Sequence, residues 1–181
     1  MRRFFAACCV LLLAGACSTT APRVDPTGET FVKVTGKSLD GNAVELPTAF
    51  LGEPSLLFVG YAQRSQFDID RWLIGVTQAG LQVKMAEVPT INGLFPTVFS
   101  ETIDEGMRSG IPSEDWAGVI TVYDEAERII KFTGNENNLP ARVLLLDAEG
   151  RVVYFHDRGF SVTSLNKLGE ALRGLDVNAT H

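Results

Sequence analysis

Residues that could carry nucleophilic, redox or metal chemistry are confined to a few places in this chain of 181 residues. The three cysteines, Cys8, Cys9 and Cys17, all lie within the first 17 residues, so the remainder has no thiol for catalysis, disulfide formation or metal binding. The two histidines, His156 and His181, cannot form a histidine metal site alone. We therefore expect no metal, no cofactor and a function that does not depend on sulfur chemistry.

The first 17 residues have the pattern of a removable leader. A pair of arginines precedes an apolar run over 4–13, which is too short to cross a membrane. Small residues then lead to Cys17, which resembles the lipidated cysteine of bacterial lipoproteins, and Ser18 resembles the residue that follows it in outer-membrane lipoproteins. We expect a lipid anchor on Cys17 and a location in the bacterial cell envelope, facing the periplasm, with the outer membrane favoured. Plain secretion is the alternative.

Beyond the leader, composition favours one acidic domain behind a spacer. Residues 18–30 are rich in Ser, Thr and Pro, which predicts a flexible tether. Residues 31–176 are enough for one domain with its own core. The net charge of −6 becomes more negative when the leader arginines are removed, which disfavours a nucleic-acid partner.

A strand–helix–strand unit predicts the centre of an α/β domain. The run over 55–61 is the most apolar of the mature chain and is expected to be the central strand. Helical spacing predicts a helix over 66–79 with Phe67 and Trp72 directed inward, and 81–88 returns as a strand. This alternation predicts a parallel pair with a right-handed crossover.

The C-terminal part predicts a hairpin covered by a helix. The apolar run over 143–146 is followed by a turn that ends at Gly150 and by a strand rich in β-branched and aromatic residues over 151–156. Leucines at helical spacing over 165–175 predict the covering helix.

Shorter elements are expected between these units. They are strands over 31–35 and 38–46, a helix from Phe95 that ends at Pro112, a strand over 119–123, and a helix capped by Asp124.

This order of elements, with Pro140 just before the hairpin, resembles the thioredoxin-like fold, an α/β fold with a central mixed β-sheet flanked by helices on both faces. In that family the reactive thiol lies at the N-terminus of the first long helix, where free backbone N–H groups and the helix dipole stabilise a thiolate. The matching segment here runs from Tyr61 to Asp68 and has no cysteine, so we expect Ser65 or Asp68 to cap the helix instead. The family's proline slot falls on Ala141, and X–Pro preferences favour a trans bond before Pro140.

Candidate binding residues lie on the loops around the missing thiol. Tyr61, Gln63 and Arg64 follow the central strand, and Arg142 resembles the arginine that peroxiredoxins carry near their active cysteine. We expect Arg64 and Arg142 to face one another and to form an anion or carboxylate site beside a helix N-terminus. In the simpler interpretation each arginine pairs with an acidic residue or is solvated. Phe160 is a candidate partner contact, with packing as its simpler role.

A narrower resemblance is to the ATP-synthase assembly chaperones first known from mitochondria. This resemblance covers about residues 50–175 and rests on the order and spacing of several motifs. They are Leu94-Phe95-Pro96, Gly110-Ile111-Pro112, Trp116, Thr121-Val122-Tyr123 and Val143–Asp147 with Gly150. The resemblance implies a cysteine-independent thioredoxin-like domain that handles a membrane-protein subunit during assembly.

We therefore expect a membrane-tethered protein that is not an enzyme and that binds a protein client in or near the membrane, as a chaperone or assembly factor. One alternative is a binding protein or enzyme for a small anionic ligand at Arg64 and Arg142. Another is a regulator of a redox partner that has no thiol of its own.

Overall fold

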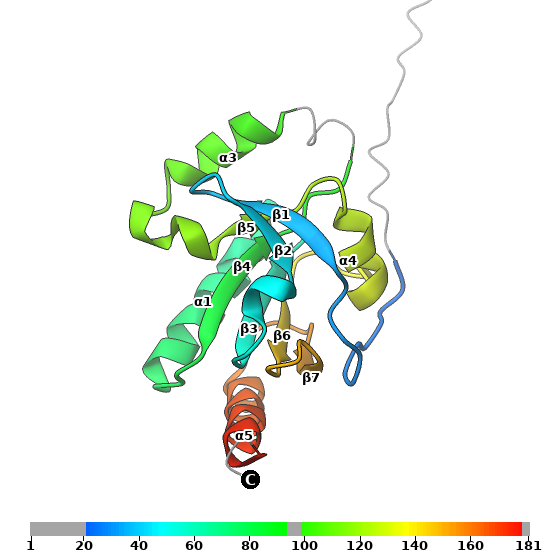
Figure 1. The fold of residues 1–181 in the computed structure, drawn as a ribbon, viewed down its shortest axis with the longest axis vertical. Helices are drawn as coiled ribbons and strands as arrows, with labels where there is room; N and C mark the ends of the chain where they lie inside the picture. The colour runs from blue at the N-terminus through cyan, green and yellow to red at the C-terminus, as the bar shows by residue number, and fades with distance from the viewer. Residues whose placement is uncertain (1–20, 94–98, 179–181) are drawn as a thin grey trace, which may run out of the picture.

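A four-stranded sheet in the order β4-β3-β6-β7 forms the centre of the computed structural model, which describes residues 21–93 and 99–178 (Figure 1). Its strands are β3 (Ser55–Gly60), β4 (Lys84–Pro89), β6 (Arg142–Leu146) and β7 (Val152–His156). Strand β3 pairs in parallel with β4 and antiparallel with β6. The predicted parallel pair and C-terminal hairpin are therefore confirmed.

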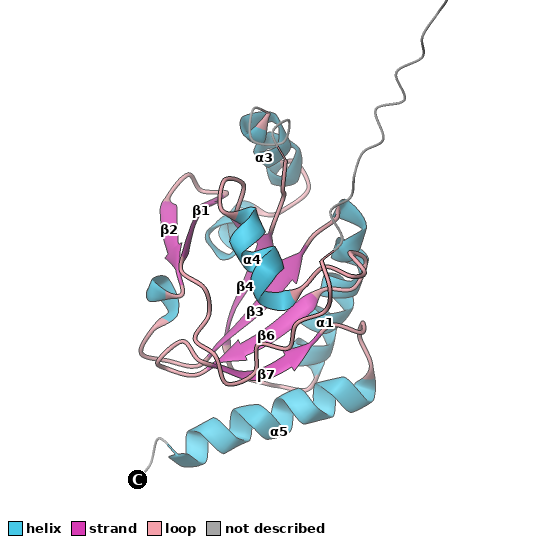
Figure 2. Ribbon diagram, turned by 90° about the vertical axis from the view of Figure 1, so that its right-hand side faces the viewer, coloured by secondary structure: helices cyan, strands magenta, loops and turns pink. Residues whose placement is uncertain are grey.

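Helices cover both faces of this sheet, as expected (Figure 2). Helices α1 (Gln66–Gln78) and α5 (Val162–Asn178) pack on one face, where Trp72 of α1 and Leu168 of α5 are almost fully buried. Helix α4 (Ala126–Thr133) contributes Ile129 to the core on the other face. Because both faces are covered, β3 and β6 are buried along their whole length, which explains their continuous apolar runs.

A second, three-stranded sheet lies beside the first, in the order β2-β1-β5. Its strands are β1 (Val34–Ser38), β2 (Ala43–Leu46) and β5 (Ile120–Thr121). The predicted opening hairpin is present, although its first strand begins three residues later than expected. The strand predicted over 119–123 is only two residues long and pairs with β1.

Two helix boundaries differ from the sequence prediction. Helix α3 (Ser100–Arg108) ends four residues before Pro112, and its predicted start at Phe95 lies outside the described residues. Helix α4 is not capped by Asp124, because Glu125 occupies the N-cap position and makes no side-chain capping bond there. The Glu125 carboxylate accepts a hydrogen bond from the Thr35 backbone N–H instead (2.7 Å), which joins the helix to β1.

The segment predicted as a flexible tether is docked on the domain wherever it is described. We refer to residues 21–30 as the N-terminal strap. Its backbone pairs with the outer edge of β7, where the Gly28 N–H donates to the Val152 carbonyl (2.8 Å) and the Val152 N–H donates to the Glu29 carbonyl (2.9 Å). An edge strand presents unpaired N–H and C=O groups, and the strap satisfies some of them. Composition alone did not reveal this partner.

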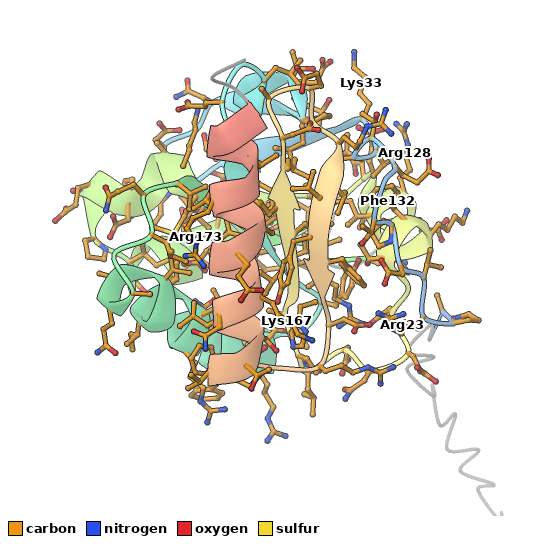
Figure 3. The ribbon with its side chains drawn as sticks, turned by 90° about the horizontal axis from the view of Figure 1, so that it is seen from below. Arg23, Lys33, Arg128, Phe132, Lys167 and Arg173 are labelled. Carbon is orange, nitrogen blue, oxygen red and sulfur yellow. The ribbon has the colours of Figure 1, made fainter. Side chains whose placement is uncertain are left out.

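The strap also crosses one end of the sheet. The Asn135 N–H donates to the Ala21 carbonyl (2.9 Å) and the Val24 N–H to the Thr133 carbonyl (3.3 Å). Arg23 forms an ion pair with the buried carboxylate of Asp157 (2.8 Å) and lies 5.5 Å from the Phe155 ring centroid (Figure 3).

Candidate functional site

Asp68 joins three segments at the end of the sheet where β3 leads into α1. It lies in the first turn of α1 and is only 8% exposed. One carboxylate oxygen accepts a hydrogen bond from the Ala141 N–H just before β6 (3.0 Å), and the other accepts one from the Phe160 N–H in the loop after β7 (2.8 Å). We expected Ser65 or Asp68 to cap the helix. The Asp68 carboxylate instead holds two neighbouring loops against the first turn of α1.

Ser65 reinforces the same junction. It occupies the N-cap position of α1 without a side-chain capping bond to that helix. Its buried hydroxyl accepts a hydrogen bond from the Ala62 N–H (3.1 Å) and donates one to the Asn138 carbonyl (3.0 Å). The loop before β6 is thus held to the start of α1 at two points. The Leu139–Pro140 bond in this loop is trans, as favoured from the sequence, since Leu46–Pro47 is the cis peptide among the described residues.

Arg142 is a buried cation directly beneath this loop. It is 2% exposed, and its Nη1 donates to the carbonyls of Asn137 (2.6 Å) and Pro140 (2.8 Å). Its Nε is buried without a hydrogen-bond partner in the described part of the chain. The guanidinium carbon lies 4.9 Å from the Tyr61 ring centroid, a cation–π arrangement.

Burial and the neighbouring groups Tyr61 and Asp157 shift the pKa of Arg142 in opposite directions. Burial lowers the pKa of the Arg142 guanidinium below its usual value, while Tyr61 and Asp157 partly restore it and Arg158 lowers it further. Burial also raises the pKa of the Tyr61 hydroxyl to about 12, although that hydroxyl is hydrogen-bonded to the Thr133 hydroxyl (2.6 Å). The cation that lowers the pKa of Arg142 is Arg158, and the predicted pairing of Arg142 with Arg64 stays a prediction.

Gln63 and Arg64 lie on the exposed surface of a short 3-10 helix (Gln63–Ser65) that leads into α1. Arg64 forms no ion pair with any described residue, which agrees with the simpler interpretation of a solvated side chain. Gln63 and Arg64 thus border the junction, whereas Tyr61 and Arg142 lie within it.

Phe160 is a packing residue more than a surface contact. Its half-buried ring meets the Trp72 ring edge-on, with centroids 5.4 Å apart. A Cβ placed on Gly75 of α1 would lie 2.6 Å from the ring, so the glycine makes this close approach possible. The simpler sequence interpretation of Phe160 therefore describes its position well.

Three exposed apolar side chains lie on the segments that the Asp68 junction joins, and the sequence pattern did not reveal them as a surface. Phe67 is 68% exposed, Leu139 45% and Val162 66%. Each lies within two residues of a group in the Asp68 network, so all three segments meet here. We refer to these three residues as the apolar rim. The prediction that Phe67 points inward was wrong, because Asp68, Ile69 and Trp72 form the buried face of α1.

Two further features of the described structure concern small-molecule and metal sites. An open cleft of about 510 Å³ is lined by residues of β1, β5 and the start of α4, including Lys37, Tyr123 and Glu125, and by none of the predicted site residues. No group of three or more His, Cys, Asp and Glu side chains in the described ranges could hold a metal ion.

Known structures share this architecture at low sequence identity. The domain of a thiol-disulfide oxidoreductase from Bacteroides vulgatus superposes with a TM-score of 0.55 at 18% identity, covering 82% of this chain and 99% of that domain. A SCO1/SenC family lipoprotein from Bacillus anthracis gives 0.56 at 14% identity, covering 86% of this chain and 99% of the other. Yeast Sco1 gives 0.57 at 15% identity, with 80% and 95% covered.

The chain has a thioredoxin-like fold. The expected fold class is therefore confirmed. No family model and no curated protein sequence matches the chain, so the narrower resemblance to ATP-synthase assembly chaperones stays a prediction. The Asp68 junction lies at the start of the first long helix, where the thioredoxin-like resemblance places a reactive thiol, and the chain has no cysteine after Cys17.

Proposed function

We propose that this protein is a membrane-tethered assembly factor or chaperone that binds a client protein through the apolar rim and does not act as an enzyme. One observation carries the proposal: exposed Phe67, Leu139 and Val162 lie on three segments that the Asp68 hydrogen bonds join, and the chain beyond Cys17 has no thiol. Scattered surface apolar residues are common, but here three of them border one hydrogen-bonded network.

The junction makes the rim suitable for recognition. Aromatic and aliphatic side chains stabilise protein interfaces most when their backbone is already ordered, because little conformational entropy is then lost on binding. The two Asp68 hydrogen bonds and the Ser65 bonds supply this order to all three rim segments. Binding through a preformed apolar surface needs no reactive group.

The proposed location follows from the sequence pattern around Cys17, which lies outside the described residues. A lipid on Cys17 would hold the domain at the periplasmic side of the cell envelope, with the outer membrane favoured by Ser18. The similarity in fold to a SCO1/SenC family lipoprotein supports an envelope role of this kind. In the described ranges, no helix is sufficiently long and apolar to span a membrane. The proposed client is a protein in or near that membrane.

Affinity capture tests the proposal. We would purify the full-length protein from detergent-solubilised membranes as wild type, as Phe67→Ser and as Leu139→Ser, with Ile74→Ser as an exposed apolar control on α1. One defined protein should be retained by wild type and Ile74→Ser, and should fall at least about tenfold in the rim variants, as expected for loss of a buried apolar contact. Equal recovery with all four proteins would contradict the proposal.

A small-anion site is a second candidate, favoured by the buried Nε of Arg142, which has no hydrogen-bond partner among residues 21–93 and 99–178. A buried cation without a carboxylate partner is costly, and a bound anion would offset that cost. Phosphate and acetate should then raise the melting temperature of wild type more than that of Arg142→Lys, in which the planar guanidinium fork is lost. Equal shifts in the two proteins would contradict this candidate.

A further inference from the structure

The N-terminal strap leaves the domain at the same end of the sheet as the apolar rim. Its first described residue, Ala21, is hydrogen-bonded to Asn135, and Asn138 of the same loop accepts the Ser65 hydrogen bond beside the rim residue Leu139. Figure 3 shows Arg23 at the end of the molecule where α5 begins with Val162. The strap and the rim thus share one end of the domain.

The strap is held too firmly at this point to swing to another face. Arg23 is ion-paired with the buried Asp157, which precedes the loop that Asp68 fixes. Gly134 lies directly under the strap, since a Cβ on that residue would be 2.2 Å from the Pro22 carbonyl oxygen and 2.7 Å from the Arg23 Cα. The exit direction of the chain is therefore part of the folded structure.

Chain geometry then limits the distance to the lipid anchor. Four residues separate Ala21 from Cys17 along the chain, and four extended residues span at most about 14 Å. The central strand alone, with six residues at about 3.3 Å each, is roughly 20 Å long, so the anchor cannot reach the opposite end of the sheet, where the turn at Glu149 lies.

We propose that the strap fixes the orientation of the domain and holds the apolar rim at the membrane surface. The client is then an apolar segment of a membrane protein at the level of the lipid headgroups. The exposed cations Arg64 and Arg158 border the same end of the domain and suit a surface of lipid phosphates. This inference rests on the proposed lipid anchor and client-binding function, and it adds the orientation of the domain relative to the membrane.

Energy transfer to the membrane tests the orientation without the client and without lipidation in the cell. Cys17 is the only thiol of the mature chain, residues 17–181, so it can be coupled to a maleimide lipid. A fluorescent amino acid would replace Gln63 near the rim or Glu149 at the opposite end. Vesicles of phosphatidylethanolamine and phosphatidylglycerol would carry an acceptor on their headgroups.

We expect transfer from position 63 to be several times more efficient than transfer from position 149. Two changes that free the strap, Arg23→Ala and a ten-residue Gly-Ser insertion between Thr20 and Ala21, should reduce this ratio toward one. Arg173→Ala removes an exposed cation from α5 and should leave the ratio unchanged.

Equal transfer from the two positions would overturn the inference. A ratio that survives both strap changes would also overturn it, and would indicate that the face itself binds lipid. Neither result affects the test of client binding in detergent, so the failure of this inference and the failure of the proposed function are distinguishable.

Discussion

Asp68 shows how one buried carboxylate can organise a site that has no reactive group. Its two oxygens each accept a backbone N–H from a different loop; one loop carries the rim residue Leu139 and the other leads to Val162 at the start of α5. The Asp68 side chain thus orders both loops, because loops are generally more mobile than the helices and strands that they connect. At the scale of single residues, the order of the apolar rim therefore depends on one hydrogen-bond acceptor, the Asp68 carboxylate.

Replacing Asp68 should destabilise the fold in a graded way. Asp68→Ala leaves two backbone N–H groups without acceptors, and at about 1–3 kcal/mol each the free energy of unfolding should fall by about 2–6 kcal/mol. Asp68→Asn keeps one acceptor oxygen and should lie between wild type and alanine. Urea unfolding measures these differences, with the exposed Asp70→Ala as a control expected to change stability by less than about 0.5 kcal/mol. Equal losses in the Asn and Ala variants would contradict this role.

Glu87 provides a test of pH dependence. Burial in β4 raises the pKa of its carboxyl above the usual value, and Asp70 and Asp115 add to the effect, although Gln66 partly opposes it by hydrogen bonding. The folded protein then binds more protons than the unfolded chain, so stability contributed by Glu87 is lost as the pH rises through the raised pKa.

Glu87→Gln should consequently be more stable than wild type at pH 7. The difference should vanish below about pH 4, where the carboxyl is protonated in both states. Urea unfolding across this range measures it. An advantage that is constant with pH, or largest in acid, would contradict the assignment.

At the scale of elements, the N-terminal strap is part of the folded domain, whereas the sequence predicted a flexible tether. Residues 21–30 pair with β7 and cross the end of the sheet, so the domain includes a segment that composition marks as a spacer. Gly134, with φ of +71°, ends α4 and leaves space for the strap at the same time.

Gly134→Ala should displace the strap. The new Cβ would overlap the backbone of Pro22 and Arg23, so trypsin should cleave after Arg23 much faster than in wild type. Gly80→Ala is the control, because Gly80 also has a positive φ (+66°) but a Cβ there meets no atom within 4 Å. Mass spectrometry of timed digests would compare the two. Equal cleavage rates in these variants would contradict the close packing.

The sequence pattern predicted the main strands and helices, but it predicted the site only in part. The runs at 55–61 and 143–146 are buried on both faces, so their pattern is unambiguous. Phe67 was misassigned because a polar residue, Asp68, takes the buried position next to it, and hydrophobicity cannot reveal a buried carboxylate that is satisfied by distant backbone groups. The docking of the strap was missed for the same reason, since its bonds are mostly made by backbone atoms.

At the scale of the whole molecule, the fold is that of proteins with thiol chemistry, but the chain beyond Cys17 has no cysteine. Mature protein should therefore show no reduction of insulin disulfides or of hydrogen peroxide above the rate without protein, since disulfide exchange needs a thiolate. The chain with Cys17→Ser controls for the anchor cysteine. Activity that survives in this variant would contradict the proposal of a non-redox function.

Site-specific photo-crosslinking in living cells shows whether the apolar rim contacts a client protein. A photoreactive amino acid would replace Phe67 in the apolar rim or Glu149 at the opposite end of the sheet, in the full-length protein. We expect one defined membrane-associated protein to be crosslinked from position 67. This product should be lost when Leu139→Ser is added and should be absent from position 149. The same products from both positions, or no product from position 67, would contradict this expectation.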